Sequence, residues 1–368
     1  MKIKRVSLFL KAIPMSMGNT CSLDASIDAA EVVVTRIETD TGLVGIGECG
    51  TVAGYPASAR SVIEGSADLA AAHLMDMDPT LIGAVNERLL GVPGQIGALR
   101  TGIDMACWDI LGKAEGKPLH ALLGGKLQET VPIYCLIVGE SPDELASSLQ
   151  EWRQKGFKRF HFRVVRADIA THQARINRIL SMREAGETFN IDFAGTWRAQ
   201  DVLEIINGID SRGFTLEQPG WTMAECAAIR NRVDQAVKLD DCLNSPRDVL
   251  DAVRMQACES VVLHINRIGG VTPVRLARDI AVQAGLRVTY STQWGTEITT
   301  AAMTHLAITT PPGTLLTSID AHAYSPLPMT ATSPFVVAGQ EMWFAEDKPG
   351  LGVDVDEDAL GELVRDIT

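Results

Sequence analysis

From residue 131 onward the chain repeats one hydrophobic pattern, in which a short apolar run precedes a helix-length amphipathic stretch. The unit recurs about every 25 residues, as expected for alternating strands and helices. Such alternation indicates parallel βαβ connections. Eight apolar runs can be read: VPIYCLIV, RFHFRV, FNIDFA, GFTLEQP, AVKLDDC, SVVLHIN, LRVTYST and TLLTSID. The pattern predicts an α/β protein whose residues 126–325 form a (β/α)₈-type barrel, a modified TIM barrel. The alternative, an open doubly wound sheet, normally has a Gly-rich phosphate turn after its first strand, and none follows here.

The two ends of the chain have a different rhythm. KIKRVSLFLKAI and AEVVVTRIETDTGLVGIGECG predict three antiparallel strands, the last two joined by a turn at residues 40–42. Helical periodicity follows, most clearly in GALRTGIDMACWDILGKAEG. Residues 1–125 are therefore expected to form an α+β capping domain. Residues 326–368 are rich in Pro, Gly and acidic residues and are expected to return to that domain and complete it.

Within the predicted barrel strands, side-chain alternation directs one carboxylate of each of three consecutive strands inward. In FNIDFA, GFTLEQP and AVKLDDC the bulky apolar residues share one face, which leaves Asp192, Glu217 and Asp240 on the other. Asp241 has the opposite parity and is not included. The three acids lie near the C-terminal ends of their strands, where the active sites of such barrels are built.

Three carboxylates in one barrel mouth repel each other unless a cation lies between them. A metal ion is the simplest explanation, and ligation by oxygen alone favours Mg²⁺, with Mn²⁺ as the second choice. In the alternative interpretation each acid pairs with a nearby base, such as Lys238 or Arg163. One acid alone would favour that alternative, whereas three on consecutive strands favour the metal.

Basic side chains occupy the flanking strands. RFHFRV places His161 and Arg163 on its inward side, and SVVLHIN places His264 there. An isolated histidine on a strand is more often a hydrogen-bonded core residue, but facing a set of acids it becomes a candidate base. Residues after the last two strands are further candidates for lining the mouth and binding substrate, although each could equally cap a loop or pack: Gln293, Trp294, Glu297 and Asp320.

Composition narrows the partners. The 368 residues have a formal net charge of -13, a pI near 5.0 and a mean hydropathy of +0.09. These values argue against nucleic acid and membrane as partners and leave a small-molecule substrate. The seven cysteines are widely spaced, odd in number and without a CxxC pair, which is typical of reduced thiols and favours a cytoplasmic location.

Several longer motifs resemble the enolase superfamily, in its muconate lactonizing enzyme and mandelate racemase-like branch. The motifs cover essentially the whole chain: IDMACWDILGKAEGKPLHALLGG, IDFAGTW, LEQPG, LDDCL, HINRIGGV and KPGLGVDVDEDAL. The resemblance is closest to cis-3-hydroxyproline dehydratases and hydroxyproline-betaine epimerases. It implies Asp192, Glu217 and Asp240 as metal ligands, a carboxylate substrate, a homo-oligomer, and removal of the proton α to the carboxylate with Mg²⁺ stabilising the enediolate.

The sequence departs from that family at the bases. Relatives of this type commonly have a K-x-K pattern on the second barrel strand and a lysine on the sixth, where this chain has His161-Phe162-Arg163 and His264. Arginine is a poor base and a good anion clamp. A single competent base favours dehydration of a hydroxy acid or hydroxy-amino acid, with His264 taking the α-proton. Two alternatives remain: an epimerase that pairs His264 with His161, and a non-catalytic metal- or ligand-binding relative.

Overall fold

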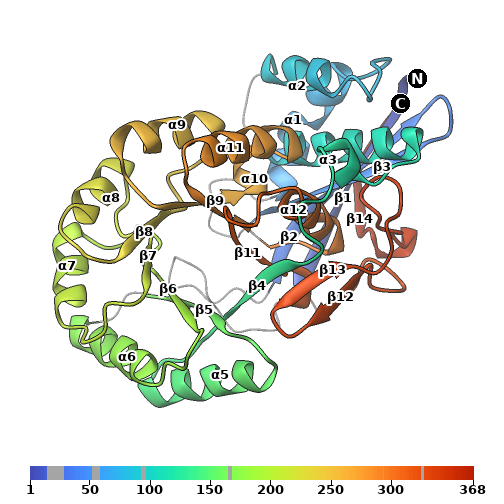
Figure 1. Ribbon diagram of the computed structural model, residues 1–368. Coiled ribbons are helices and arrows are strands. Elements are labelled where there is room, and N and C mark those ends of the chain that lie inside the picture. The colour runs from blue at the N-terminus through green and yellow to red at the C-terminus, as the bar shows by residue number, and fades with distance from the viewer. Residues whose placement is uncertain (15–28, 52–58, 93–96, 165–167, 293, 325–326) are drawn as a thin grey trace.

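The computed structural model describes residues 1–14, 29–51, 59–92, 97–164, 168–292, 294–324 and 327–368. Its centre is a closed ring of eight parallel strands, in which each strand pairs with the next and the last pairs with the first (Figure 1). The strands are β4 (Val131–Leu136), β5 (Arg159–Arg163), β6 (Thr188–Asp192), β7 (Thr215–Glu217), β8 (Ala236–Leu239), β9 (Ser260–His264), β10 (Arg287–Ser291) and β11 (Leu315–Ile319). All eight apolar runs therefore form barrel strands, and the predicted fold class is confirmed.

Helices cover the outside of the ring because the outward strand residues are large and apolar. Phe160, Ile191 and Leu216, for example, are fully buried between strand and helix layers. The barrel helices are α5 (Pro142–Gln154), α6 (Ile169–Ser181), α7 (Ala199–Asn207), α8 (Met223–Arg230), α9 (Pro246–Met255), α11 (Val271–Gln283) and α12 (Glu297–Ile308), with the short α10 (Ile265–Ile268) directly after β9. None of the helices in the described ranges is both long and apolar enough to cross a membrane.

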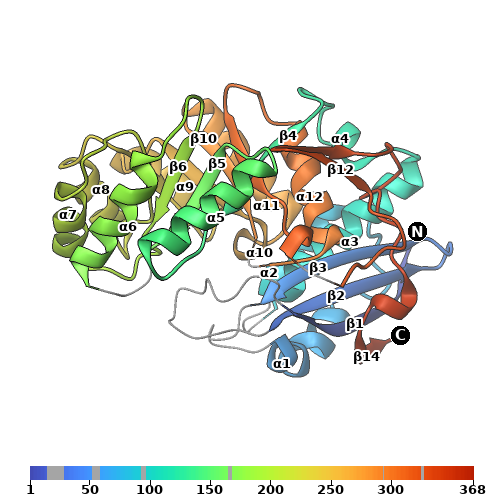
Figure 2. The same ribbon diagram turned by 90° about the horizontal axis from the view of Figure 1, so that it is seen from below.

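A separate antiparallel sheet lies beside the barrel (Figure 2). Its strand order is β14-β1-β2-β3, with β1 (Ile3–Pro14), β2 (Ala29–Thr39), β3 (Val44–Thr51) and β14 (Glu362–Ile367). The helices of this cap are α1 (Ala59–Ala72), α2 (Ile82–Leu90), α3 (Gly97–Glu115) and α4 (Leu119–Leu122). Helix α3 packs closely on β3, since the backbone carbonyl of Gly102 lies where a side chain at Gly47 would stand.

The C-terminal segment divides between the two parts of the molecule. Strand β14 pairs with β1 and so completes the cap sheet, as the sequence predicted. The hairpin of β12 (Phe335–Ala338) and β13 (Glu341–Phe344) instead pairs with barrel strand β4. Two 3₁₀ turns, at His322–Tyr324 and Glu357–Ala359, lie on either side of this hairpin in the chain.

Candidate active site

Strand register places four charged side chains in one row across the barrel. Arg163 on β5 is the register partner of Asp192 on β6, which is the partner of Glu217 on β7, which is the partner of Lys238 on β8. Arg163 Nε donates to Asp192 Oδ2 over 2.7 Å, and Lys238 Nζ lies 3.2 Å from Glu217 Oε2. The two inner positions of the row are therefore acidic and the two outer positions basic.

The third predicted acid lies just beyond the end of its strand. Since β8 ends at Leu239, Asp240 and Asp241 follow a loop path, and both carboxylates contact Arg267. Arg267 Nη1 donates to Asp241 Oδ1 over 2.8 Å, while Nη2 is paired with Asp240. Strand alternation does not apply to Asp241, because β8 ends two residues before it, and the structure places its carboxylate beside that of Asp240.

The acids differ in their ionisation. Burial opposes the charge on Asp192, but Arg163 and His161 outweigh it and hold the pKa of Asp192 below its ordinary value. Burial raises the pKa of Asp240 well above its ordinary value; Arg267 opposes this effect, and repulsion from Asp241 and other carboxylates adds to it. A carboxylate pushed toward its neutral form by burial and by neighbouring carboxylates would be stabilised in its charged form by additional positive charge.

His161 on β5 is surrounded on the inward side by polar groups of β6 and an aromatic ring of β4. Its Nε2 lies 3.4 Å from Asp192 Oδ2, and its Nδ1 lies 2.9 Å from Asn190 Nδ2. Asn190 Nδ2 also donates to Glu217 Oε2 over 2.6 Å. The ring of Tyr134 stacks on the imidazole, with 5.5 Å between ring centroids. Both ring nitrogens of His161 are therefore engaged.

A divalent cation fits this cluster. Ligand atoms of His161, Asp192 and Glu217 all lie within 4.8 Å of one another, and all three residues are buried. The alternative that each acid pairs with a base is also seen, since Arg163, Lys238 and Arg267 serve the three predicted acids. Among the residues that the structure describes, that pairing leaves four carboxylates to three cationic side chains, because Asp241 shares Arg267 with Asp240. A cation held by carboxylate oxygens removes the imbalance.

His264, at the end of β9, has a contrasting environment. It is 6% exposed, and its Nδ1 has no hydrogen-bond partner in the described part of the chain. Burial lowers the pKa of His264 well below its ordinary value, and Arg267 and Arg163 lower it further. The imidazole is consequently neutral at pH 7 and able to accept a proton.

Of the remaining predicted residues, Trp294 and Asp320 both lie near Tyr324, whereas Glu297 contacts the C-terminal segment. Trp294, after β10, has a positive φ of 71° and packs edge-on against Tyr324, close to the buried Asp320 that follows β11. Glu297 is instead turned toward the C-terminal segment, where its carboxylate accepts from Met329 N over 3.1 Å and from Thr330 Oγ1 over 3.4 Å. Gln293 lies outside the described residues.

The cap domain reaches the site through β3. Asn266, two residues after His264, donates from Nδ2 to the carbonyl of Gly50 over 3.0 Å, while its Oδ1 accepts from Thr292 Oγ1 over 2.9 Å. The fully buried Glu48 accepts from the backbone N–H of Thr296, which is the N-cap of α12, over 2.8 Å. The cap thus fixes the loops that follow β9 and β10.

Four residues of this cluster were not predicted from the sequence: Asn190, Tyr134, Arg267 and Asp241. Asn190 has the same inward parity as Asp192, so a polar residue in an apolar strand was an available signal. Tyr134 offered a similar signal on β4, where its ring stacks on His161. For Arg267 and Asp241 the chain contains no local signal, because both lie beyond a strand end.

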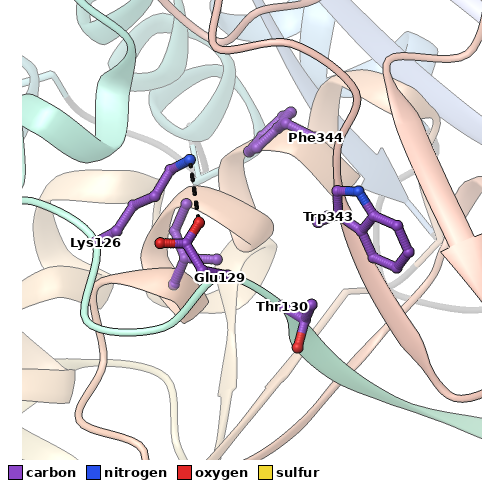
Figure 3. Close-up of a pocket in the computed structure, with 6 residues that line it drawn as sticks. Lys126, Glu129, Thr130, Trp343 and Phe344 are labelled. Atoms are coloured by element: carbon purple, nitrogen blue, oxygen red, sulfur yellow. Dashed lines mark ion pairs between the residues drawn. The ribbon is translucent and has the colours of Figure 1, made fainter.

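A cavity of about 350 Å³ lies elsewhere in the molecule (Figure 3). Lys126 and Glu129, 3.8 Å apart, and Thr130 place it at the start of β4, at the opposite end of the strand from the charged row. The other lining residues come from the end of α12 and from β13: Ile308, Trp343 and Phe344. None of the predicted site residues contributes to it.

Fold and site together place the protein among the acid–base enzymes built on TIM barrels. Residues 7–124 match the family described as mandelate racemase / muconate lactonizing enzyme, N-terminal domain, and residues 144–359 match the enolase C-terminal domain-like family. The chain therefore belongs to the mandelate racemase/muconate lactonizing enzyme family of the enolase superfamily. It is an enzyme, a lyase or an isomerase.

Individual relatives are similar over the whole chain. A cis-3-hydroxy-L-proline dehydratase from Roseibium aggregatum is 31% identical over 99% of both chains. An N-succinyl-L-Arg/Lys racemase from Bacillus cereus is 24% identical over 99% of this chain and 98% of its own. A solved structure of an enolase superfamily member from Roseovarius nubinhibens, complexed with magnesium, superposes with a TM-score of 0.92 at 32% identity and covers 100% of this chain and 99% of its own.

Proposed function

We propose that this enzyme removes the proton α to a carboxylate with the help of Mg²⁺ and then expels a β-hydroxyl, so that it dehydrates a hydroxy acid or hydroxy-amino acid. The observation that carries the proposal is the asymmetry of the two histidines. His264 is neutral and has a ring nitrogen without a partner, whereas both nitrogens of His161 are engaged. The similarity to a hydroxyproline dehydratase supports a proline derivative as the first substrate to test.

In this proposal Asp192, Glu217 and Asp240 hold the cation at the ends of β6, β7 and β8. When bound, Mg²⁺ supplies positive charge to the substrate carboxylate and lowers the cost of removing its α-proton. Arg163 stays protonated, holds Asp192 in place over 2.7 Å, and adds positive charge on the β5 side of the mouth.

His264 performs the proton transfers. Its neutral imidazole accepts the α-proton, and the electron pair of the broken C–H bond moves toward the carboxylate. That pair then forms the Cα–Cβ double bond as the Cβ–O bond breaks. The protonated His264 returns the proton to the leaving hydroxyl, which departs as water, so the histidine ends the cycle neutral. One base on one face of the substrate is sufficient for this sequence.

An epimerase is the second candidate, supported by the similarity to a racemase. Epimerisation needs a base on each face, and His161 would have to release Asn190 and Asp192 to serve as the second. These contacts, together with the stacked ring of Tyr134, hold His161 in place, which supports dehydration.

The test is incubation of the enzyme with Mg²⁺ in D₂O and cis-3-hydroxy-L-proline, other proline derivatives, sugar acids and amino acids, followed by proton NMR. Loss of water from one substrate, abolished in His264→Asn and retained in His73→Gln, just after helix α1, supports the dehydratase. Deuterium incorporation with inversion and without water loss would assign the enzyme as an epimerase. An absence of both across the panel would contradict the proposal.

We also propose a cytoplasmic location and a homo-oligomeric assembly. The cysteines at positions 49, 107, 135, 226, 242 and 258 are free thiols, which suits a reducing compartment. The family resemblance supports the oligomer, and size-exclusion chromatography with light scattering tests it.

A further inference from the structure

His161 lies close to two carboxylates, those of Asp192 and Glu217, and proton transfer does not require such a position. Its Nε2 faces Asp192 Oδ2 at 3.4 Å, and together with an oxygen of Glu217 these atoms span at most 4.8 Å. Ligand atoms around one cation, at bond lengths of about 2.1 Å, lie roughly 3 Å apart when adjacent and roughly 4 Å apart when opposite. The three atoms therefore already approach the spacing of one coordination sphere.

Asn190 lies at the position of a residue behind a metal-bound histidine, although its amide nitrogen rather than its oxygen faces the ring. Ligating histidines usually donate the N–H of their other nitrogen to an acceptor that fixes the ring. Asn190 lies 2.9 Å from His161 Nδ1 through its amide nitrogen, while its buried Oδ1 has no hydrogen-bond partner among the described residues. Rotating the amide by 180° occupies the same space. It places Oδ1 against Nδ1–H and also next to Glu217 Oε2, which the amide nitrogen otherwise holds at 2.6 Å. Since two oxygens repel at that distance, the flip requires Glu217 to turn its carboxylate away from Asn190, as it would to hold a cation.

The ring is also fixed from the other side. Tyr134 stacks on the imidazole with an angle of 28° between the ring planes, and His161 is 6% exposed. A ring held in plane by Tyr134 and at its far nitrogen by Asn190 keeps Nε2 directed at Asp192. Rigid orientation of this kind favours ligation over the movement that proton shuttling requires.

We propose that His161 is a nitrogen ligand of the bound cation beside Asp192 and Glu217, so that the site binds Mn²⁺, Co²⁺ or Zn²⁺ more tightly than Mg²⁺. The inference rests on the proposed function in that a cation binds at this cluster. Imidazole suits these borderline ions, whereas Mg²⁺ prefers oxygen ligands and keeps its water. Ligation uses the Nε2 lone pair, which leaves His264 as the base of the reaction.

The experiment uses the full-length, tag-free enzyme, stripped of metal and reloaded with Mn²⁺. Pulsed EPR of the Mn²⁺ enzyme detects coupling to ligand nitrogen, and labelling with ¹⁵N-histidine changes that coupling only if the nitrogen belongs to histidine. Calorimetry then compares Mn²⁺ and Mg²⁺ binding in the wild type and in His161→Gln. We expect histidine coupling in the wild type, its loss in the variant, and a Mn²⁺ affinity at least tenfold weaker with Mg²⁺ affinity changed less than threefold.

The outcomes separate the inference from the proposed function. Saturable Mn²⁺ binding without histidine coupling in the wild type overturns the inference and leaves a metal-dependent enzyme. Coupling that persists in His161→Gln also overturns it, because another histidine is then the ligand. No saturable binding of either ion overturns the proposed metal dependence, and the inference with it. The wild-type spectrum decides the question even if the variant folds poorly.

Discussion

The two sides of the barrel mouth each present one buried histidine, and the two histidines are placed in opposite electrostatic surroundings. His161 on β5 lies against Asp192 and below the ring of Tyr134. His264 on β9 lies near two cations, Arg163 and Arg267, and makes no hydrogen bond through Nδ1 in the part of the chain the structure describes. Both are 6% exposed, so burial does not distinguish them.

The difference shows that neighbours assign the role of a buried histidine. An imidazole among carboxylates is held by them and is suited to binding a cation. An imidazole among guanidinium groups is kept neutral, and a neutral ring with a free lone pair is suited to accepting a proton. In the proposed mechanism the two tasks are divided, with His264 as the base and His161 beside the cation.

Removing the β9 histidine is expected to have the largest effect. His264→Asn keeps a polar side chain and removes the base, so we expect kcat to fall by about 10²–10⁴-fold, the range for loss of a general base. The affinity for Mn²⁺ measured by calorimetry is expected to stay within threefold. A variant that also loses cation affinity would contradict the assignment of proton transfer to His264 and of cation binding to the β5 side.

A third buried histidine, remote from the mouth, is expected to control stability in acid. His305 on α12 accepts from the backbone N–H of His120 at Nδ1 and faces the carbonyl of Leu351 through Nε2. Burial lowers the pKa of His305 to about 3, below its ordinary value of 6.5, with His120 and Lys126 lowering it further and the Leu351 carbonyl opposing them. The unfolded chain therefore binds more protons, and stability is lost as the pH falls below 6.5.

For His305 alone this linkage lowers the free energy of unfolding by about 2 kcal/mol between pH 7 and pH 5. Urea unfolding at both pH values measures the loss, and His305→Gln is expected to reduce it by that amount while His73→Gln does not. An unchanged pH dependence in His305→Gln would contradict this prediction. Because His305 is remote from the mouth, the result distinguishes acid unfolding of the protein from protonation of His264.

The pH dependence of catalysis is expected to follow His264. The base must be neutral, and its pKa lies well below 6.5, so the acidic limb of kcat/KM is expected below pH 6.5 with activity falling about tenfold per pH unit beneath it. Steady-state kinetics at pH values where circular dichroism shows folded enzyme provide the test. A limb at or above pH 6.5 would mean that the cationic neighbours do not govern this histidine.

The smallest effect is expected at the link between cap and barrel. Asn266→Ala removes the bonds to Gly50 and to Thr292 Oγ1, which hold the β9 and β10 loops to the cap. We expect KM to rise roughly fivefold to tenfold, consistent with loss of about 1 kcal/mol of positioning, and kcat to change less than threefold. Asn266→Asp, which keeps only the acceptor toward Thr292, should fall in between. A loss confined to kcat would instead place Asn266 among the proton-transfer groups.

The barrel and the inward acids on strands β6 and β7 could be predicted from the sequence alone. Apolar alternation is a local property, and parallel strands bring their carboxyl ends to one edge, so Asp192 and Glu217 could be placed from their strands alone. The same rule does not extend to Asp241, because β8 ends at Leu239. Glu297 was predicted to line the mouth, and its carboxylate instead serves residues 329 and 330.

Side-chain contacts between different elements could be found only in the tertiary structure. Asn190 reaches both His161, its register partner on β5, and Glu217, which lies two residues beyond its register partner Thr215 on β7. Arg267 meets Asp240, and Glu48 meets Thr296 from 248 residues away. Such contacts depend on how packed elements meet, which alternation along one strand does not encode. The roles proposed for the two histidines rest on these contacts, since the sequence predicts two imidazoles on inward faces, and in the fold one lies among carboxylates and the other among guanidinium groups.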